Sequence, residues 1–109
     1  MEQTAIELLF VEDDDGFRET AAQWMTRKGH HVQAAASGTE ALKLCDRTHF
    51  DVAVVDMNMP GLSGLDLLQQ IRQRGLETEV IILTGQATVE TAVQAMKLGA
   101  SDYLTKPFP

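Results

Sequence analysis

Cysteine, positive charge and long apolar segments are all scarce in this sequence of 109 residues. The single cysteine, Cys45, excludes an internal disulfide, and we expect it to be a small apolar core residue because no neighbouring base or motif would activate its thiol. Neither a secretory leader nor an apolar stretch long enough to cross a membrane is present, so we expect no membrane attachment and a cytoplasmic location.

Acidic residues outnumber basic ones, with 16 Asp and Glu against 9 Lys and Arg and a formal charge of -7. This balance argues against direct binding of nucleic acid or of an anionic membrane surface. His30, His31 and His49 lack the spacing of zinc ligands and are expected on the surface or in loops. The length suits one domain, residues 1–109.

Short apolar runs alternate with segments of helical periodicity. Strands are expected at residues 6–11, 31–35, 51–56, 80–83 and 102–105, with the second at an edge because it is only partly apolar. Helices are expected between them, at residues 15–28, after residue 37, from residue 63 to 75, and around residues 89–96. Five strands alternating with four helices predict an α/β fold with a doubly wound parallel sheet.

Capping signals mark the starts of two of these helices. Ser37 with Glu40 has the spacing of a capping box, in which Glu40 reaches back to the cap, and Ser63 with Asp66 is a weaker match. Asp14 is expected to cap a helix or to face solvent.

Polar residues follow the buried strands at the edge where an α/β sheet binds its ligands. Asp56 ends the central apolar run, and Glu12, Asp13, Thr84 and Lys106 follow other strands. Clustered carboxylates need a cation, and hard oxygen ligands with room for water suit Mg²⁺. A lysine and a hydroxyl opposite a metal-bound carboxylate are what phosphoryl transfer requires, so Asp56 is the candidate nucleophile that becomes an aspartyl phosphate.

Together these motifs resemble the receiver domain of two-component response regulators. The resemblance is carried by residues 11–14 (VEDD), 54–61 (VVDMNMPG), 83–85 (LTG), 99–100 (GA) and 103–108 (YLTKPF), and it covers essentially the whole chain. Residues 91–108 look especially like receivers attached to σ54-dependent transcriptional activators. They also resemble receivers of some helix-turn-helix regulators and hybrid kinases. The resemblance implies a flavodoxin-like receiver fold with strand order 2-1-3-4-5, and phosphoryl transfer from the phosphohistidine of a sensor histidine kinase to Asp56.

The resemblance also implies a metal site. Mg²⁺, with Mn²⁺ as a substitute, would bind Glu12, Asp13, Asp56 and the backbone carbonyl of Asn58. Many members carry Asp where this chain has Glu12, and the longer arm is expected to act through a water molecule.

Other roles are implied for residues around the acids. Lys106 would pair with the phosphoryl group, Thr84 would move to hydrogen-bond it, and Tyr103 would be the switch residue that then turns inward. Asn58 and Gln86 would tune hydrolysis of the acyl phosphate. The resemblance further predicts a cis peptide between Lys106 and the following proline.

Family members continue into a fifth helix, whereas this sequence stops at Pro109. We therefore expect a C-terminally truncated receiver domain with an exposed apolar patch, lower stability and a tendency to associate non-natively. The implied partners are the kinase, a C-terminal output domain that regulates transcription, and a second copy in a homodimer.

Three alternatives share part of this pattern. A phosphatase of the haloacid-dehalogenase type also uses a strand-end Asp with Mg²⁺, but its second acid is absent because Asn58 stands two residues after Asp56. A binding-only receiver-like module usually lacks an acid, the Thr or the Lys, and a flavodoxin-like cofactor binder needs a Gly-rich loop where this chain has acids. We therefore expect no enzyme beyond self-phosphorylation and slow autodephosphorylation.

Overall fold

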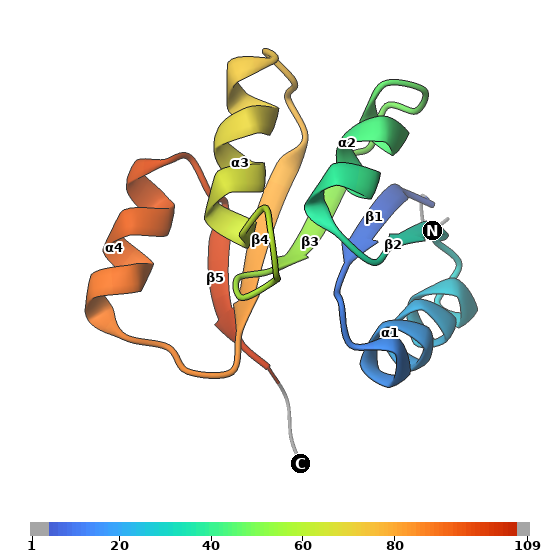
Figure 1. Ribbon diagram of the computed structural model, residues 1–109. Helices are drawn as coiled ribbons and strands as arrows, with labels where there is room; N and C mark the ends of the chain where they lie inside the picture. The colour runs from blue at the N-terminus through green and yellow to red at the C-terminus, as the bar shows by residue number, and fades with distance from the viewer. Residues whose placement is uncertain (1–4, 107–109) are drawn as a thin grey trace, which may run out of the picture.

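The computed structural model of the chain describes residues 5–106. Its strands are β1 (Glu7–Val11), β2 (His31–Ala35), β3 (Val52–Asp56), β4 (Glu79–Thr84) and β5 (Asp102–Thr105). They alternate with the helices α1 (Asp15–Arg27), α2 (Gly38–Cys45), α3 (Gly64–Gln73) and α4 (Val89–Lys97). The strands form one parallel sheet in the order β2-β1-β3-β4-β5 (Figure 1), which confirms the predicted topology and the edge position of β2.

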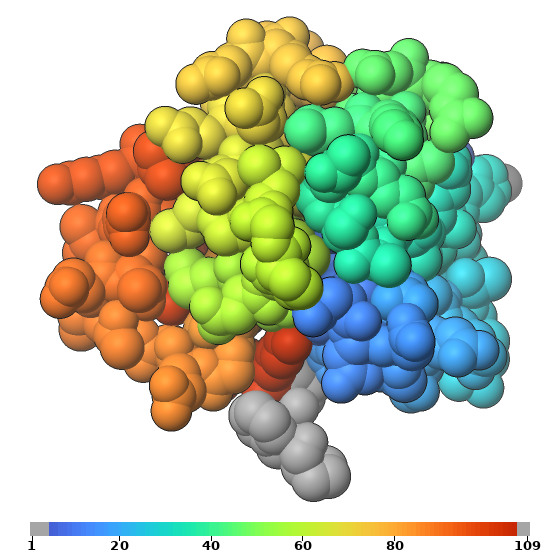
Figure 2. Space-filling view, viewed as in Figure 1, coloured from blue at the N-terminus to red at the C-terminus, as the bar shows by residue number. Residues whose placement is uncertain are grey.

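The sheet separates two apolar cores because successive side chains of a strand point to opposite faces. The larger core lies against α2, α3 and α4 and includes Leu9, Val11, Ala41, Val55, Leu67, Leu68, Ile71, Ile82 and Ala95. The smaller core, built on Leu8, Phe10 and Leu83, packs against α1. Figure 2 looks onto the first of these faces, where α2 and α3 lie side by side.

Each helix begins at a capping side chain, as the sequence predicts for three of the four. Asp14 Oδ1 accepts a hydrogen bond from the third helical amide of α1 at 3.0 Å, and Ser37 accepts one from the amide of Glu40 at 3.2 Å. The prediction that the Glu40 carboxylate accepts a hydrogen bond from the N–H of Ser37 is wrong, because no such bond forms among the described residues. Complete capping boxes occur instead at Ser63 with Asp66 and at Thr88 with Thr91.

Arg72 of α3 forms hydrogen bonds that connect three segments of the chain. Its guanidinium donates to the carbonyl of Gly99 at 2.9 and 3.2 Å, to that of Leu76 at 3.1 Å and to that of Thr78 at 2.8 Å. These bonds connect α3 to the turn before β5 and to the loop that enters β4.

Cys45 packs against the larger core from α2, as predicted. Burial raises the pKa of its thiol, so less of the nucleophilic thiolate is present at neutral pH.

Apolar surface is exposed on both sides of the sheet. On one side, α4 exposes Val89, Val93 and Met96 while Ala95 faces the core. On the other side runs a groove, here called the α1 groove, which is lined among others by Phe10, Val54, Leu83, Leu104, Phe17 and Trp24. The α1 groove is an exposed apolar surface, whereas the C-terminal truncation, lower stability and non-native association stay predictions.

The predicted cis bond between Lys106 and Pro107 and the motif residue Phe108 lie outside the described residues. None of the helices described between residues 5 and 106 has the length and apolar character needed to span a bilayer.

Candidate functional site

Four strands deliver polar residues to one edge of the sheet. Glu12 directly follows β1, Asp56 and Thr84 are the last residues of β3 and β4, and Lys106 directly follows β5. Glu12 and Asp56 are only 1% and 3% exposed, and Thr84 is fully buried, whereas Asp13 faces solvent. The parallel register brings these strand ends together, as predicted from the alternation of strands and helices.

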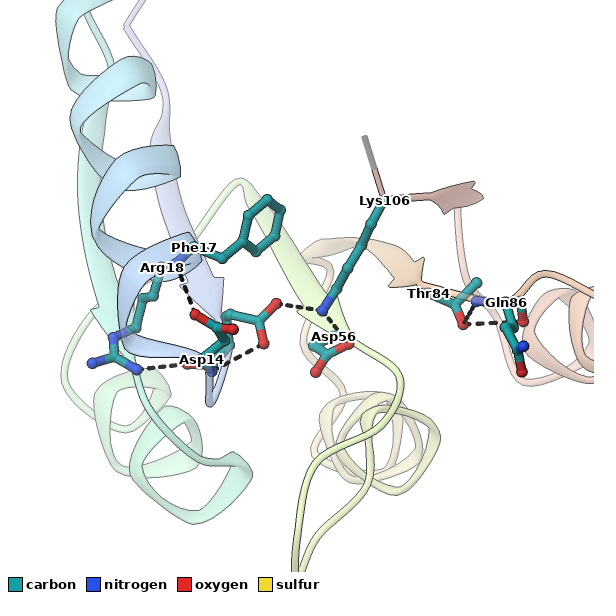
Figure 3. A network of polar contacts seen from close by, with 8 residues as sticks. Asp14, Phe17, Arg18, Asp56, Thr84, Gln86 and Lys106 are labelled. Carbon is teal, nitrogen blue, oxygen red and sulfur yellow. Dashed lines mark hydrogen bonds and ion pairs between the residues drawn. The ribbon is translucent and has the colours of Figure 1, made fainter. Parts of the chain in front are cut away.

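Lys106 contacts both buried carboxylates, and Figure 3 shows its side chain extending to Asp56. Its Nζ is 2.8 Å from Oε1 of Glu12 and 3.2 Å from Oδ1 of Asp56. Its backbone N–H donates to the carbonyl of Thr84 at 2.8 Å, which anchors the lysine to the end of β4. The ammonium also lies 5.2 Å from the centre of the Phe17 ring.

Glu12 is held from both its backbone and its side chain. Oε2 accepts from the amide of Asp14 at 3.1 Å, and the Glu12 carbonyl accepts from Nη1 of Arg18 at 2.8 Å. Among the described residues, Oε1 has no partner besides the ammonium of Lys106. Arg18 is not predicted from the sequence, since the spacing of an arginine in a helix does not indicate which carbonyl its side chain will reach.

Burial and mutual charge set the protonation of this cluster. Burial raises the pKa of Asp56, and hydrogen bonds and charge from Lys106 offset this only in part. Burial likewise raises the pKa of Glu12, and the negative charge of Asp56 adds to the rise. For Lys106, burial alone would lower the pKa, but its bonds to Glu12 and Asp56 raise it overall, so the lysine stays charged.

The carboxylates have the properties of a divalent cation site. Oxygens of Glu12, Asp13 and Asp56 lie within 4.8 Å of one another. The cluster has three carboxylates, two of which pair with the single ammonium of Lys106, and within residues 5–106 the buried Oε1 of Glu12 has no partner besides that ammonium. A hard cation would balance this excess charge and use that oxygen, so the residues fit Mg²⁺.

Thr84 does not contact the acids in this structure. Its hydroxyl donates to the carbonyl of Gln86 and accepts from the amide of Gln86, both at 3.2 Å. Figure 3 shows Thr84 and Gln86 to one side of Asp56. Both hydrogen bonds of the Thr84 hydroxyl are therefore made to the backbone of Gln86. The hydroxyl would have to break them to reach a group on Asp56.

Tyr103 connects β5 to α4 and to the loop after Asp56. It is half-buried, and its hydroxyl hydrogen-bonds the hydroxyl of Thr91 and lies 4.0 Å from Sδ of Met57. Thr91 also completes the capping box of α4 with Thr88. Thr91 is not predicted from the sequence either, because its contact with Tyr103 depends on how α4 packs.

Comparison with known proteins decides the family. Residues 8–109 match the family described as "Response regulator receiver domain". This chain belongs to that family. The receiver domain is 37% identical over 103 residues to "Two-component response regulator PhoP" of Pseudomonas aeruginosa, covering 94% of this chain and 46% of that protein. It is 43% identical over 102 residues to "Transcriptional regulatory protein FixJ" of Azorhizobium caulinodans, covering 90% and 46%.

Among solved structures, the receiver domain superimposes on the chemotaxis protein CheY4 of Vibrio cholerae with a TM-score of 0.91. The two are 29% identical, and the match covers 97% of this chain and 90% of that chain. Receiver domains of two-component systems are signalling switches and generally bind Mg²⁺, which agrees with the acidic cluster. The chain spans less than half the length of the two curated relatives.

Proposed function

We propose that this receiver domain is a phosphorylation-dependent switch, and that Asp56 accepts a phosphoryl group from the phosphohistidine of a sensor histidine kinase. The observation that supports this best is the buried Asp56, which shares one ammonium with Glu12 at contact distances of 3.2 and 2.8 Å. A buried nucleophile beside a fixed cation is what phosphoryl transfer needs, because its catalysis is mostly positioning and charge neutralisation.

In the proposed reaction, a carboxylate oxygen of Asp56 attacks the phosphorus as the bond between phosphorus and the histidine nitrogen breaks. Lys106 turns from Asp56 to the phosphoryl oxygens and neutralises part of their charge. Glu12 (through a water molecule), Asp13, Asp56 and the backbone carbonyl of Asn58 would hold Mg²⁺, which would supply the remaining positive charge.

Phosphorylation then shifts the equilibrium between two arrangements of the β4–α4 loop. Thr84 leaves its turn with Gln86 and donates to the phosphoryl group, and Tyr103 turns further inward and changes its contact with Thr91. This alters the surface of α4 and β5, where Val93 and Met96 are exposed. Asn58 and Gln86, two residues after Asp56 and Thr84, tune hydrolysis of the acyl phosphate.

In the full protein, we propose that this surface controls a C-terminal output domain that regulates transcription, in the manner of σ54-dependent activators. The relative FixJ is a transcriptional regulatory protein by name, which supports a transcriptional output. We further propose that residues 1–109 act as one domain in the cytoplasm, and that a homodimer forms through the same face.

The test is intact mass after incubation with Mg²⁺ and acetyl phosphate. We expect a gain of one phosphoryl group that EDTA prevents and that Asp56→Asn abolishes. Asp15→Asn is the matched control, because Asp15 lies at the same edge of the molecule but its side chain is 83% exposed. No gain in the wild-type chain, or an equal gain in Asp56→Asn, would contradict the proposal, and steady hydrolysis of a generic phosphate ester would favour the phosphatase alternative.

A further inference from the structure

Phe17, in the first turn of α1, is the one aromatic residue in contact with the lysine of the site among the described residues. Its ring centre lies 5.2 Å from Nζ of Lys106, within the range of a cation–π interaction. Figure 3 shows the ring on the α1 side of the lysine, across from Asp56.

The ring is fixed by its surroundings. The amide of Phe17 donates to the capping oxygen of Asp14 at 3.0 Å, which sets where α1 begins. The ring packs against Phe10 with centroids 6.0 Å apart and planes tilted by 59°, and Phe10 is only 2% exposed. The position of the Phe17 ring beside the lysine is therefore set by its packing against the smaller core.

The other partners of Lys106 do not stay constant during the proposed reaction. Glu12 and Asp56 hold the ammonium only while their carboxylates bind nothing else. In the proposed reaction, Asp56 binds the phosphoryl group, and both carboxylates help to bind the metal. The quadrupole of a neutral ring attracts a cation whether or not those carboxylates are engaged. We infer that Phe17 is a positioning residue for Lys106, holding its ammonium over the site where the phosphoryl group arrives.

This inference rests on the proposed function, since it concerns the lysine of the same site. It also predicts that leucine and tryptophan at position 17 behave differently, which a role in packing alone would not predict. Leucine would retain most of the apolar contact with Phe10 and the α1 groove but has no π face. Tryptophan has a π face that attracts a cation more strongly than that of phenylalanine.

The experiment compares Phe17→Leu and Phe17→Trp with the wild-type chain. Trp24→Leu is the matched control, because Trp24 lies on the same helix, lines the same α1 groove and contacts Lys28 at the same 5.2 Å, away from the acids. Two quantities are measured, namely the second-order rate constant for phosphorylation by acetyl phosphate and the NMR shift of the Lys106 ε-methylene protons. The resonance is assigned by its loss in Lys106→Met, and urea denaturation shows that each variant is folded.

We expect the ε-methylene protons of Lys106 to be shifted upfield by the ring current in the wild type and in Phe17→Trp, but not in Phe17→Leu. The rate constant should fall by roughly three- to tenfold in Phe17→Leu, return to within about twofold of wild type in Phe17→Trp, and stay unchanged in Trp24→Leu.

An unshifted ε-methylene in the wild type would overturn the inference, even if Phe17→Leu does not fold. So would a Phe17→Leu rate equal to wild type, or a Phe17→Trp rate as low as that of Phe17→Leu. Absence of phosphorylation in the wild type with the shift present would instead contradict the proposed function, so the two failures are distinguishable.

Discussion

Gly64 lies against the backbone of the strand that carries Asp56. A Cβ added at Gly64 would be 2.3 Å from the carbonyl oxygen of Asp56 and 2.7 Å from Cα of Met57. Both are backbone atoms, so no change of rotamer relieves the contact. The amide of Gly64 also donates to the carbonyl of Met57 at 2.9 Å, which holds the start of α3 against the end of β3.

Gly64→Ala should therefore destabilise the domain and disturb the site together. The backbone must move by about 0.7 Å for the Cβ to reach even 3.0 Å from the carbonyl oxygen. Overpacking of this kind costs about 1–3 kcal/mol, and a strained or lost hydrogen bond costs about 0.5–1.5 kcal/mol. Alanine's better helix propensity offsets up to about 1 kcal/mol. The expected net loss in free energy of unfolding lies between about 0.5 and 4.5 kcal/mol, with a central value of about 2.5 kcal/mol.

Gly16→Ala provides the matched control, because Gly16 also lies in the first turn of a helix. Its added Cβ would meet only Oδ1 of Asp14, at an ordinary 3.6 Å. We expect this variant to gain up to about 1 kcal/mol. Urea denaturation measures both effects, and the rate of phosphorylation by acetyl phosphate should fall only in Gly64→Ala. Equal midpoints for the two variants would refute the steric reasoning.

Three further changes test other contacts of the domain. Burial raises the pKa of Asp56 in the folded state above the ordinary 3.8. The wild-type domain therefore loses stability as pH rises through this folded-state pKa, because Asp56 must then carry a buried charge. Without Mg²⁺, Asp56→Asn should be more stable than wild type at pH 7. Denaturation at several pH values should show this advantage shrinking toward pH 4, and a constant difference would contradict it. Arg72→Met should cost about 2–3 kcal/mol through its lost carbonyl bonds, whereas Arg74→Ala, which breaks an exposed ion pair, should cost less than about 1 kcal/mol by the same assay. Tyr103→Phe and Thr91→Val should each cost about 0.5–1.5 kcal/mol, and a double-mutant cycle should show that the two losses are not additive, because both remove the same hydrogen bond.

Local patterns determined the architecture and the chemical content of the site. Apolar runs bounded by turns identified all five strands, and glycine stops and capping residues identified the four helices within a few residues. The alternation of strand and helix dictates parallel pairing, and parallel pairing sends every strand end to one edge. For that reason Asp56, Glu12 and Lys106 could be brought together from the sequence before any distance was known.

Contacts between side chains on different elements were decided only by the tertiary structure. The Phe17 ring beside Lys106, the Arg18 bond to the Glu12 carbonyl and the contact of Thr91 with Tyr103 leave no periodic signal in the sequence. Periodicity reports which face of an element is apolar, whereas these contacts depend on the angle and depth at which each helix packs on the sheet. The capping boxes show the same limit at short range, because spacing permits the reciprocal bond but side-chain entropy and surroundings decide whether it forms.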